Sequence, residues 1–575
     1  MSALLNTAPD QRQIRPTLCP VNGHAVFCAK LTPAERTDEV HLIVDTVYSL
    51  PVVFVPGIMG SNLRTKQSAT QPAVPVWRMD SKAGILRRMK DKSAGIRQNL
   101  LHPARTEVDP DGAVPNYTVG TLASAHAYRA RGWGEVSAGS YHSFLLWLEQ
   151  NLNHSFINAH APDQLQQTLQ QVTDPSTWGA QKDFLALTQT EVMHNARWAY
   201  PVYAAGYNWL ADNAEAAQSL ATRIKDIIAA NNRSIGVCEK VILITHSMGG
   251  LVARACSQMD GMDALIAGVV HGVMPTTGAA VAYRRCKVGL MDEGASGVSL
   301  DAALAWGGAK VIGQTGQEVT AVFAQSPGAL ALLPTSQYPA DWLQVRDSDG
   351  SLLPEQPSTV DPYRSIYSER NKWWGLIKEE WLSPKDGKPI DWSDFAITLA
   401  VAKKFHNKIK DHYHPNTWGF YGRGIDSFER VTWRLEAGDA PRDRDTPDPK
   451  HLMNLHRNAV RMDGTNPEEI PGPDREQELE PGLPGVILTS SYYRLRLDRA
   501  SATLSGTGDG TVPVASGRAP VQLDAVRQLF ALPGVEHEPA YQDSKVRQVT
   551  AYAVAKIAAQ TRLPDRVGAL PRPKA

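Results

Sequence analysis

The sequence lacks any excess of charge and any long apolar run. Lys and Arg together number 59, as do Asp and Glu, so the formal net charge is zero. This balance gives no electrostatic reason to expect nucleic acid or an anionic membrane surface as a partner. No stretch approaches the roughly 18 consecutive apolar residues of a membrane-spanning helix. The N-terminus has neither the basic start nor the apolar core of a secretory signal, so we expect a protein made in the cytoplasm without one.

Cysteine is also scarce. The 575 residues include 5 cysteines, Cys19, Cys28, Cys238, Cys256 and Cys286. Their odd number and their scatter argue against a disulfide framework, and no pair has the spacing of zinc ligands. We expect Cys256 to be a small buried packing residue. The sequence predicts no metal and no organic cofactor.

The most informative feature that is present is a short apolar run leading into a serine. Residues 241–244 are Val-Ile-Leu-Ile, residues 245–250 are Thr-His-Ser-Met-Gly-Gly, and a helical pattern follows. A buried strand, a tight turn around Ser247 and a helix form a nucleophile elbow, which raises the serine hydroxyl above the sheet. Thr245 replaces the first glycine of the G-x-S-x-G pattern. For this segment alone, an ordinary strand–turn–helix is therefore the alternative.

Two later segments supply an acid and a base. Asp509 lies between two glycines in a turn, and His537 precedes a helical pattern with an apolar face. Taken alone, Asp509 could belong to an ordinary surface turn, and His537 could be a packing residue without a catalytic role. The order Ser247, Asp509, His537 is the order of α/β-hydrolase triads, in which the histidine takes the serine proton and the aspartate orients the imidazole. Asp543 is the runner-up acid, but it follows the histidine.

Several further segments can be compared with known families: residues 52–55 with Pro56-Gly-Ile-Met-Gly-Ser-Asn-Leu63, Pro75-Val-Trp77, Gly206-Tyr-Asn-Trp209, Gly272-Val-Met-Pro-Thr-Thr-Gly278, 326–335 and Gly508-Asp-Gly-Thr-Val-Pro513. Together these segments resemble lecithin:cholesterol acyltransferase-like lipases and the GPI-inositol-deacylase-like hydrolases. The chain departs from the Tyr-Asp-Trp-Arg segment of these lipases at Asn208 and Leu210. Among the groups with this kind of hydrolase core, it most resembles bacterial type VI secretion lipase effectors.

The resemblance and the alternation of strands with helices imply an α/β-hydrolase fold with a mainly parallel, doubly wound sheet. We expect its core in residues 1–80, 195–300 and 485–575, interrupted by cap insertions at 81–194 and 301–484. Core strands are expected at 41–44, 52–55, 241–244, 264–270, 485–489 and 492–497, with a helix at 214–230. Residues 436–483 are rich in Pro, Asp, Glu and Arg and predict a mobile loop.

The expected chemistry is ester hydrolysis through an acyl-enzyme. Ser247 attacks the carbonyl after His537 takes its proton, and water activated by the same histidine releases the acyl group. The backbone N–H of Met248 would bind the oxyanion. The resemblance implies that Ile58 supplies the second N–H, with Met59 as its alternative. We interpret His246 and His271 as structural.

The second insertion holds an aromatic stripe. Trp373, Ile377 and Trp381 would share one face of a helix, and eight of the fourteen tryptophans fall within 301–484. Such a helix could be a lid that touches lipid. The alternative is a cap helix that packs this face onto the core.

Three functional hypotheses follow. The first is a lipase or phospholipase delivered by a type VI system into the periplasm of a target bacterium. It would act transiently at a membrane surface on a lipid substrate, with a cognate immunity protein and a secretion-spike protein as partners. The second is an intracellular esterase or acyltransferase that acts on a soluble or storage ester. The third, a catalytically inactive hydrolase used for binding, is opposed by the retention of all three triad residues.

Overall fold

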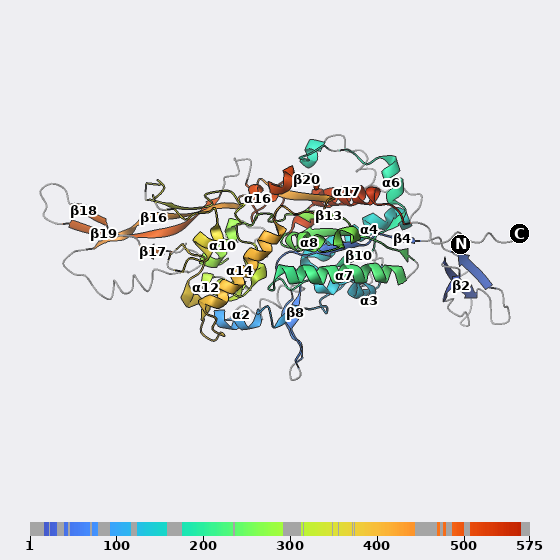
Figure 1. Cartoon of the computed structure of the whole chain (residues 1–575), viewed down its shortest axis with the longest axis horizontal. Coiled ribbons are helices and arrows are strands. Elements are labelled where there is room, and N and C mark those ends of the chain that lie inside the picture. The colour runs from blue at the N-terminus through green and yellow to red at the C-terminus, as the bar shows by residue number, and fades with distance from the viewer. Residues whose placement is uncertain are drawn as a thin grey trace.

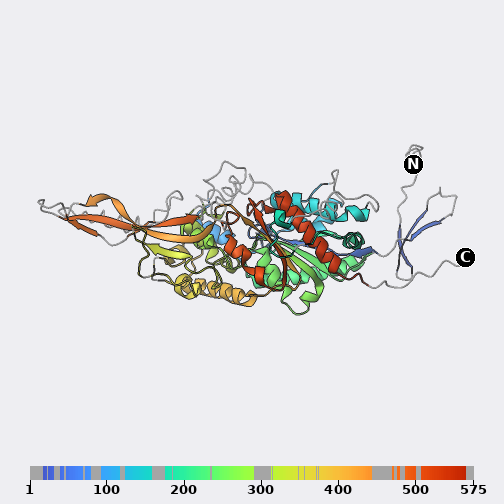
Figure 2. The same ribbon diagram turned by 90° about the horizontal axis from the view of Figure 1, so that it is seen from above.

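A computed structural model shows an elongated molecule with a central α/β body, a β-ribbon at one end and a small separate sheet at the other (Figures 1 and 2). The β-ribbon is formed by β16 (Phe428–Arg442) with β19 (Val486–Arg499). The small sheet is formed by β1 (Thr17–Val21), β2 (His24–Lys30) and β3 (Glu39–Ile43). The structure describes residues 17–21, 24–30, 39–43, 47–68, 72–78, 92–116, 123–157, 175–183, 185–233, 236–290, 312–313, 315–347, 349–354, 356–370, 372, 374–442, 469–471, 475–478, 486–499 and 507–564.

The body is built on a six-stranded sheet in the order β10-β5-β12-β13-β15-β20. Every neighbouring pair is parallel. This is the sheet of an α/β hydrolase, and it confirms the predicted fold class. The strands are β10 (Val202–Ala204), β5 (Val52–Val55), β12 (Val241–His246), β13 (Ile266–Gly272), β15 (Thr417–Arg423) and β20 (Val526–Pro533).

Helices cover both faces of this sheet, and for that reason β5 and β12 are buried along their whole length, β5 with apolar residues only and β12 with an apolar run from Val241 to Ile244. Alternate residues of β12 enter two different cores: Leu243 packs in one and Ile244 in the other. The first core includes residues of α7 (Asn213–Arg233) and α8 (Gly249–Ser257), and the second includes residues of α4 (Ala138–Ile157) and α17 (Ser544–Gln560). α7 and α17 lie on opposite sides of the sheet (Figure 1). Strands buried on both faces need continuous apolar runs.

Smaller elements surround the body. The other α-helices of the described residues are α2 (Ala94–Leu100), α3 (Ala125–Ala130), α6 (Gln189–Asn195), α9 (Met262–Leu265), α10 (Ala280–Val288), α12 (Gly316–Phe323), α13 (Pro327–Leu330), α14 (Trp392–Ile409) and α16 (Val514–Arg518). Further strands are β4 (Val47–Ser49), β6 (Leu63–Thr65), β7 (Pro75–Trp77), β8 (Thr106–Val108), β9 (Trp198–Ala199) and β11 (Gly236–Val237).

Three predicted core strands, at 41–44, 485–489 and 492–497, fall in other sheets, the last two within a single strand. β3 (Glu39–Ile43) pairs antiparallel with β2 (His24–Lys30), which pairs with β1 (Thr17–Val21), so the segment at 41–43 lies outside the central sheet. β19 (Val486–Arg499) pairs antiparallel with β16 (Phe428–Arg442). The same sheet contains β14 (Leu343–Arg346), β17 (Glu469–Pro471) and β18 (Arg475–Glu478).

Conversely, three strands of the central sheet, β10, β15 and β20, lie where no strand was expected. β15 falls within 301–484, so that range includes a core strand as well as inserted material. β20 lies between Asp509 and His537 and is the last strand of the sheet. The mobile loop expected at 436–483 is wrong where the structure describes it, because residues 436–442 belong to β16 and residues 469–471 and 475–478 form β17 and β18. Residues 443–468, 472–474 and 479–483 of the predicted loop lie outside the described residues.

The expected aromatic helix at 373–381 is wrong. Residues 374–377 form a turn and bends, and a short 3₁₀ turn follows at Glu379–Leu382. Ile377 and Trp381 are each only 5% exposed, while Trp373 lies outside the described residues. The two described side chains pack into the protein, which favours the cap-packing interpretation over the lid.

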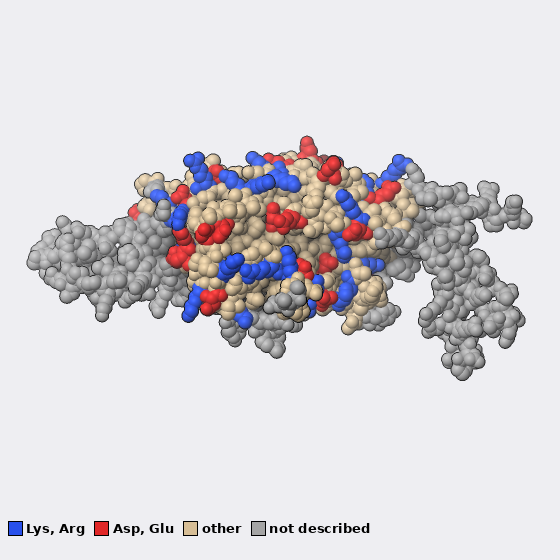
Figure 3. Space-filling model, turned by 60° about the horizontal axis from the view of Figure 1, so that its bottom comes forward, with Lys and Arg blue, Asp and Glu red and all other residues tan. Residues whose placement is uncertain are grey.

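Other local predictions are confirmed. α7 spans the helix expected at 214–230, and its N-terminus is capped by the Asp212 carboxylate, which accepts from the Ala214 N–H at 2.9 Å. α17 buries the apolar face of Val546, Val549, Ala553 and Ile557. Within the described residues, no helix combines the length and apolar character needed to cross a membrane. Acidic and basic side chains are intermingled over the described part of the face in Figure 3.

Candidate active site

Ser247 lies at the turn between β12 and α8. Its φ of 50° is in the left-handed region, which non-glycine residues rarely adopt. A Cβ added to Gly249 would lie 2.4 Å from the Pro56 carbonyl oxygen, so the helix can pass the oxyanion loop only with glycine there. Thr245, which replaces the usual first glycine, is buried and its hydroxyl lies 3.0 Å from Nδ1 of His271. The sequence thus forms the predicted elbow.

Asp509 and His537 approach the serine from separate loops. Nδ1 of His537 lies 2.8 Å from Oδ2 of Asp509, and Nε2 lies 2.9 Å from the hydroxyl oxygen of Ser247. The other oxygen of Asp509 accepts from the N–H groups of Thr511 and Val512 at 3.0 and 2.7 Å. The His537 N–H also donates to the Asp509 carbonyl. The three residues selected from the sequence are therefore brought together in hydrogen-bond contact.

The other predicted site groups flank the serine. Met248 is the N-cap of α8, and Ile58 follows Gly57 in the loop after β5. Among the described residues, neither backbone N–H has a hydrogen-bond partner. Met59, the alternative donor, has a left-handed φ of 64°, and its carbonyl accepts from the Trp77 indole at 2.8 Å. The elbow and this loop thus present unpaired N–H groups.

Asp543 has a different role from Asp509. Its carboxylate caps the N-terminus of α17 by accepting from the N–H groups of Lys545 and Val546. The structure therefore pairs His537 with Asp509, which follows the predicted chain order.

The two other histidines near the elbow are buried. Burial, with a smaller contribution from the nearby His537, lowers the pKa of His246 to about 3. Burial, together with the charge of Arg254, lowers the pKa of His271 to about 3. Both are neutral at neutral pH. Their burial agrees with the structural role predicted for each.

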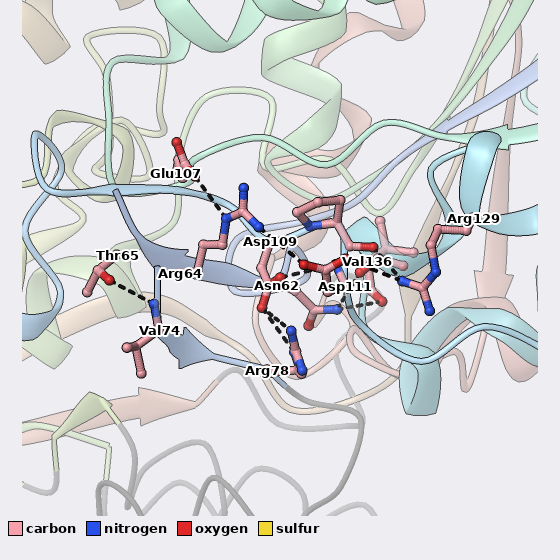
Figure 4. A network of polar contacts seen from close by, with 12 residues as sticks. Asn62, Arg64, Thr65, Val74, Arg78, Glu107, Asp109, Asp111, Arg129 and Val136 are labelled. Carbon is pink, nitrogen blue, oxygen red and sulfur yellow. Dashed lines mark hydrogen bonds and ion pairs between the residues drawn. The ribbon is translucent and has the colours of Figure 1, made fainter. Parts of the chain in front are cut away.

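A polar network anchors the far end of the oxyanion loop (Figure 4). The Asn62 side-chain amide donates to the carbonyls of Gly134 and Val136 at 2.9 and 3.2 Å. The Asn62 carbonyl accepts from the N–H of Asp109, whose buried carboxylate is paired with Arg78. Buried polar groups that are all hydrogen-bonded favour one loop conformation. This network therefore fixes the backbone that leads away from Ile58.

The sequence analysis missed one polar side chain at the site. The hydroxyl of Tyr141, from α4, lies 3.0 Å from Nδ1 of His246. Its position in the first predicted insertion carries no motif, and a tyrosine on a buried helix face has no local sequence signal that distinguishes it from other core residues. Among the described residues, no group of His, Cys, Asp and Glu side chains could hold a metal ion.

The fold and the site together define a lipase-like α/β hydrolase. Residues 199–289, which hold α7, the elbow and β13, match a family described as the PGAP1-like alpha/beta domain. Nine chains of solved structures match the fold. One of them, from the crystal structure of the Tle4–Tli4 complex, has a TM-score of 0.68 and 26% identity over 90% of this chain and 99% of its own. No curated protein matches the chain. These matches confirm the resemblance stated above.

Proposed function

We propose that the protein is a serine ester hydrolase whose triad is Ser247, His537 and Asp509. One observation carries the proposal: a continuous hydrogen-bonded run from Asp509 Oδ2 through the His537 ring to the Ser247 hydroxyl, at a left-handed elbow. An imidazole in this arrangement can accept the serine proton while the carboxylate holds its tautomer and stabilises the imidazolium.

The proposed reaction has two halves. Ser247 Oγ attacks the ester carbonyl, its proton passes to Nε2 of His537, and the collapse of the tetrahedral intermediate expels the alcohol, which takes that proton. Water then attacks the acyl-enzyme with His537 again as base, and the acid is released. The N–H groups of Met248 and Ile58 would bind the oxyanion in both halves, and one such donor contributes about 3 kcal/mol in other hydrolases.

We propose a membrane lipid, most simply a phospholipid, as the substrate. The resemblance to acyltransferase-like lipases and effector lipases supports this class. Cys238, Cys256 and Cys286 are buried, and burial raises the pKa of each thiol to about 12, so none of these three thiols competes with Ser247 as the nucleophile.

We further propose that the enzyme is an antibacterial effector exported by a type VI system. It would act in the periplasm of the target cell, and its partners would be a secretion-spike protein and an immunity protein. The similar chain was solved in a complex of two proteins, Tle4 and Tli4, which supports a protein partner for this chain as well.

Purified protein and its Ser247→Ala variant test the enzyme proposal. We expect the wild type to release acyl chains from mixed phospholipid vesicles and to cleave a p-nitrophenyl ester, and the variant to do neither while keeping its melting temperature. Retained turnover in Ser247→Ala would contradict the proposed nucleophile.

Expression in bacteria tests the effector proposal. Fusion to a periplasmic export signal should make the wild-type chain toxic, while the cytoplasmic form and exported Ser247→Ala should be tolerated. If an enzyme that is active in vitro proves harmless in both compartments, the alternative of an intracellular esterase or acyltransferase replaces the effector.

A further inference from the structure

We propose that Tyr141 and His246 are positioning residues, which tie the oxyanion loop to the loop that carries His537. This inference rests on the proposed function, because it assigns how the parts of that site are held together. The sequence analysis treated His246 only as a structural residue and did not identify Tyr141.

Three hydrogen bonds form a chain between the two loops, here named the Tyr141–His246 chain. The Gly57 N–H donates to the hydroxyl oxygen of Tyr141 at 3.3 Å, and that oxygen lies 3.0 Å from Nδ1 of His246. Nε2 of His246 lies 2.9 Å from the carbonyl oxygen of His537. The chain therefore begins one residue before Ile58 and ends on the backbone of His537.

The donors and acceptors of this chain can be assigned. A carbonyl oxygen only accepts, so Nε2 of His246 must carry the proton that it donates to His537. Burial keeps the ring neutral by lowering the pKa of His246 to about 3, so Nδ1 is the acceptor and the Tyr141 hydroxyl donates to it. Burial also raises the pKa of Tyr141, which keeps its hydroxyl protonated. All three bonds thus run in one direction, from Gly57 to His537.

Both backbone polar groups of His537, its N–H and its carbonyl, form hydrogen bonds. Its N–H donates to the carbonyl of Asp509, and its carbonyl accepts from His246. The imidazole can reach both Asp509 and Ser247 only if this backbone is correctly placed. The hydroxyl of Ser140, the residue before Tyr141, adds a bond to the Glu538 carboxylate at 2.8 Å. The start of α4 is therefore linked to the histidine loop directly through Ser140 and indirectly through Tyr141 and His246.

The oxyanion loop fits closely against the same two side chains. A Cβ on Gly57 would lie 2.8 Å from Nδ1 of His246, and a Cβ on Gly60 would lie 2.6 Å from the Tyr141 hydroxyl. Phe54 packs against the ring of Tyr141, with centroids 4.8 Å apart. Little space remains for the oxyanion loop to shift independently of Tyr141 and His246. A change in the Tyr141–His246 chain is therefore transmitted to the backbone beside Ile58.

The molecule contains a matched control for this chain. The Tyr363 hydroxyl lies 2.8 Å from Nδ1 of His406, and Nε2 of His406 lies 2.7 Å from the carbonyl of Ala331. Both side chains are buried. We name this set the Tyr363–His406 chain. It has the same chemistry but ends on Ala331, at the end of α13, instead of on His537.

The test compares Tyr141→Phe with Tyr363→Phe on a p-nitrophenyl ester. Each variant keeps the ring and loses one buried hydroxyl. We expect Tyr141→Phe to lower kcat about ten-fold with KM unchanged, the effect of one hydrogen bond that positions a reacting group. Its rate of covalent labelling by a fluorophosphonate should fall equally. Tyr363→Phe should lower the melting temperature by about as much as Tyr141→Phe does, but its kcat and its labelling rate should stay within about two-fold of the wild-type values.

Variants of His246 provide the second readout. His246→Gln keeps a donor for the His537 carbonyl and should retain more of kcat than His246→Leu. Adding Tyr141→Phe to His246→Leu should lower kcat no further, because the chain is already broken. If His246→Leu does not fold, the comparison of the two tyrosine variants decides alone.

Two results separate the failures. If Tyr141→Phe and Tyr363→Phe have the same kcat, the positioning role is wrong and the Tyr141–His246 chain is only structural. The same conclusion follows if the loss of kcat in the double variant equals the product of the losses in His246→Leu and Tyr141→Phe. If Ser247→Ala keeps its turnover, the proposed function itself fails, whatever the tyrosine variants do.

Discussion

Two regions of the molecule use one arrangement of a buried tyrosine, a buried neutral histidine and a carbonyl. In the Tyr141–His246 chain the ring centroids are 5.6 Å apart and the planes are inclined by 65°; in the Tyr363–His406 chain the values are 5.9 Å and 73°. Burial lowers the pKa of His246 to about 3 and that of His406 to about 4. The local chemistry of the two chains is therefore nearly the same.

What differs is what each chain connects. The Tyr363–His406 chain links three segments of the second predicted insertion, and its carbonyl belongs to Ala331. The other chain links Gly57 in the oxyanion loop to His537, which lies within 2.9 Å of Ser247. The same buried chain can thus stabilise a packed region or fix reacting groups, and its role depends on its end points more than on its composition.

The largest expected effect on kcat is that of removing the Asp509 carboxylate, which contacts His537 at the catalytic end of the Tyr141–His246 chain. Asp509→Asn should lower kcat by about 10⁴-fold, as in other serine hydrolases, because an amide no longer holds the His537 tautomer that accepts the serine proton. Asp543→Asn is the control, since Asp543 caps α17 and does not contact His537. Its kcat should stay within about two-fold of wild type. Steady-state kinetics on a soluble ester measure both variants; equal losses would remove Asp509 from the triad.

A smaller effect concerns the loss of folding stability at acidic pH. It tests whether the histidine of such a chain is neutral in the folded protein. Burial first, with Arg254 as a further cause, lowers the pKa of His406 from 6.5 to about 4, so below pH 6.5 the unfolded state binds a proton that the folded state does not. Stability should therefore fall as the pH drops from 6.5 to about 4. The contribution of one such histidine is about 1.4 kcal/mol per pH unit.

Urea unfolding of wild type and His406→Gln at several pH values measures this contribution. The variant should lose less stability between pH 6.5 and 4 than the wild type does, while its kcat at pH 7.5 should remain close to wild type. An unchanged pH slope would mean that His406 is protonated in the folded protein.

The smallest expected effect is that of Tyr363→Phe. Loss of its bond to Nδ1 of His406 should lower the free energy of unfolding by about 1 kcal/mol. Because nothing in this chain contacts Ser247 or His537, the activity should be retained. A loss of activity comparable with that of Tyr141→Phe would erase the distinction between the two regions.

The comparison also shows which features can be predicted from sequence. The elbow was predictable because its requirements are local: an apolar strand, a serine in a left-handed turn and Gly249 where the backbones meet. Asp509 and His537 could be chosen because chain order limits the combinations. α7 and the apolar face of α17 could be predicted from local helical patterns in the sequence.

The rest depends on contacts between distant residues. β15 lies inside a predicted insertion and has a mixed composition, with Gly419 and Gly422 each next to an aromatic residue, so its place in the sheet follows from pairing with β13 and β20. β19 has a strong strand pattern but pairs with β16 outside the central sheet. Tyr141 is 105 residues from His246, and no local pattern links the two.

The central claim is that Ser247 forms a covalent acyl intermediate. Rapid quenching of the enzyme during turnover of an activated ester, followed by mass spectrometry of its peptides, tests it most directly. We predict an acyl adduct on the peptide that contains Ser247, formed at a rate consistent with kcat and absent from Ser247→Ala. Full turnover without an adduct, or an adduct on a different residue, would contradict the account.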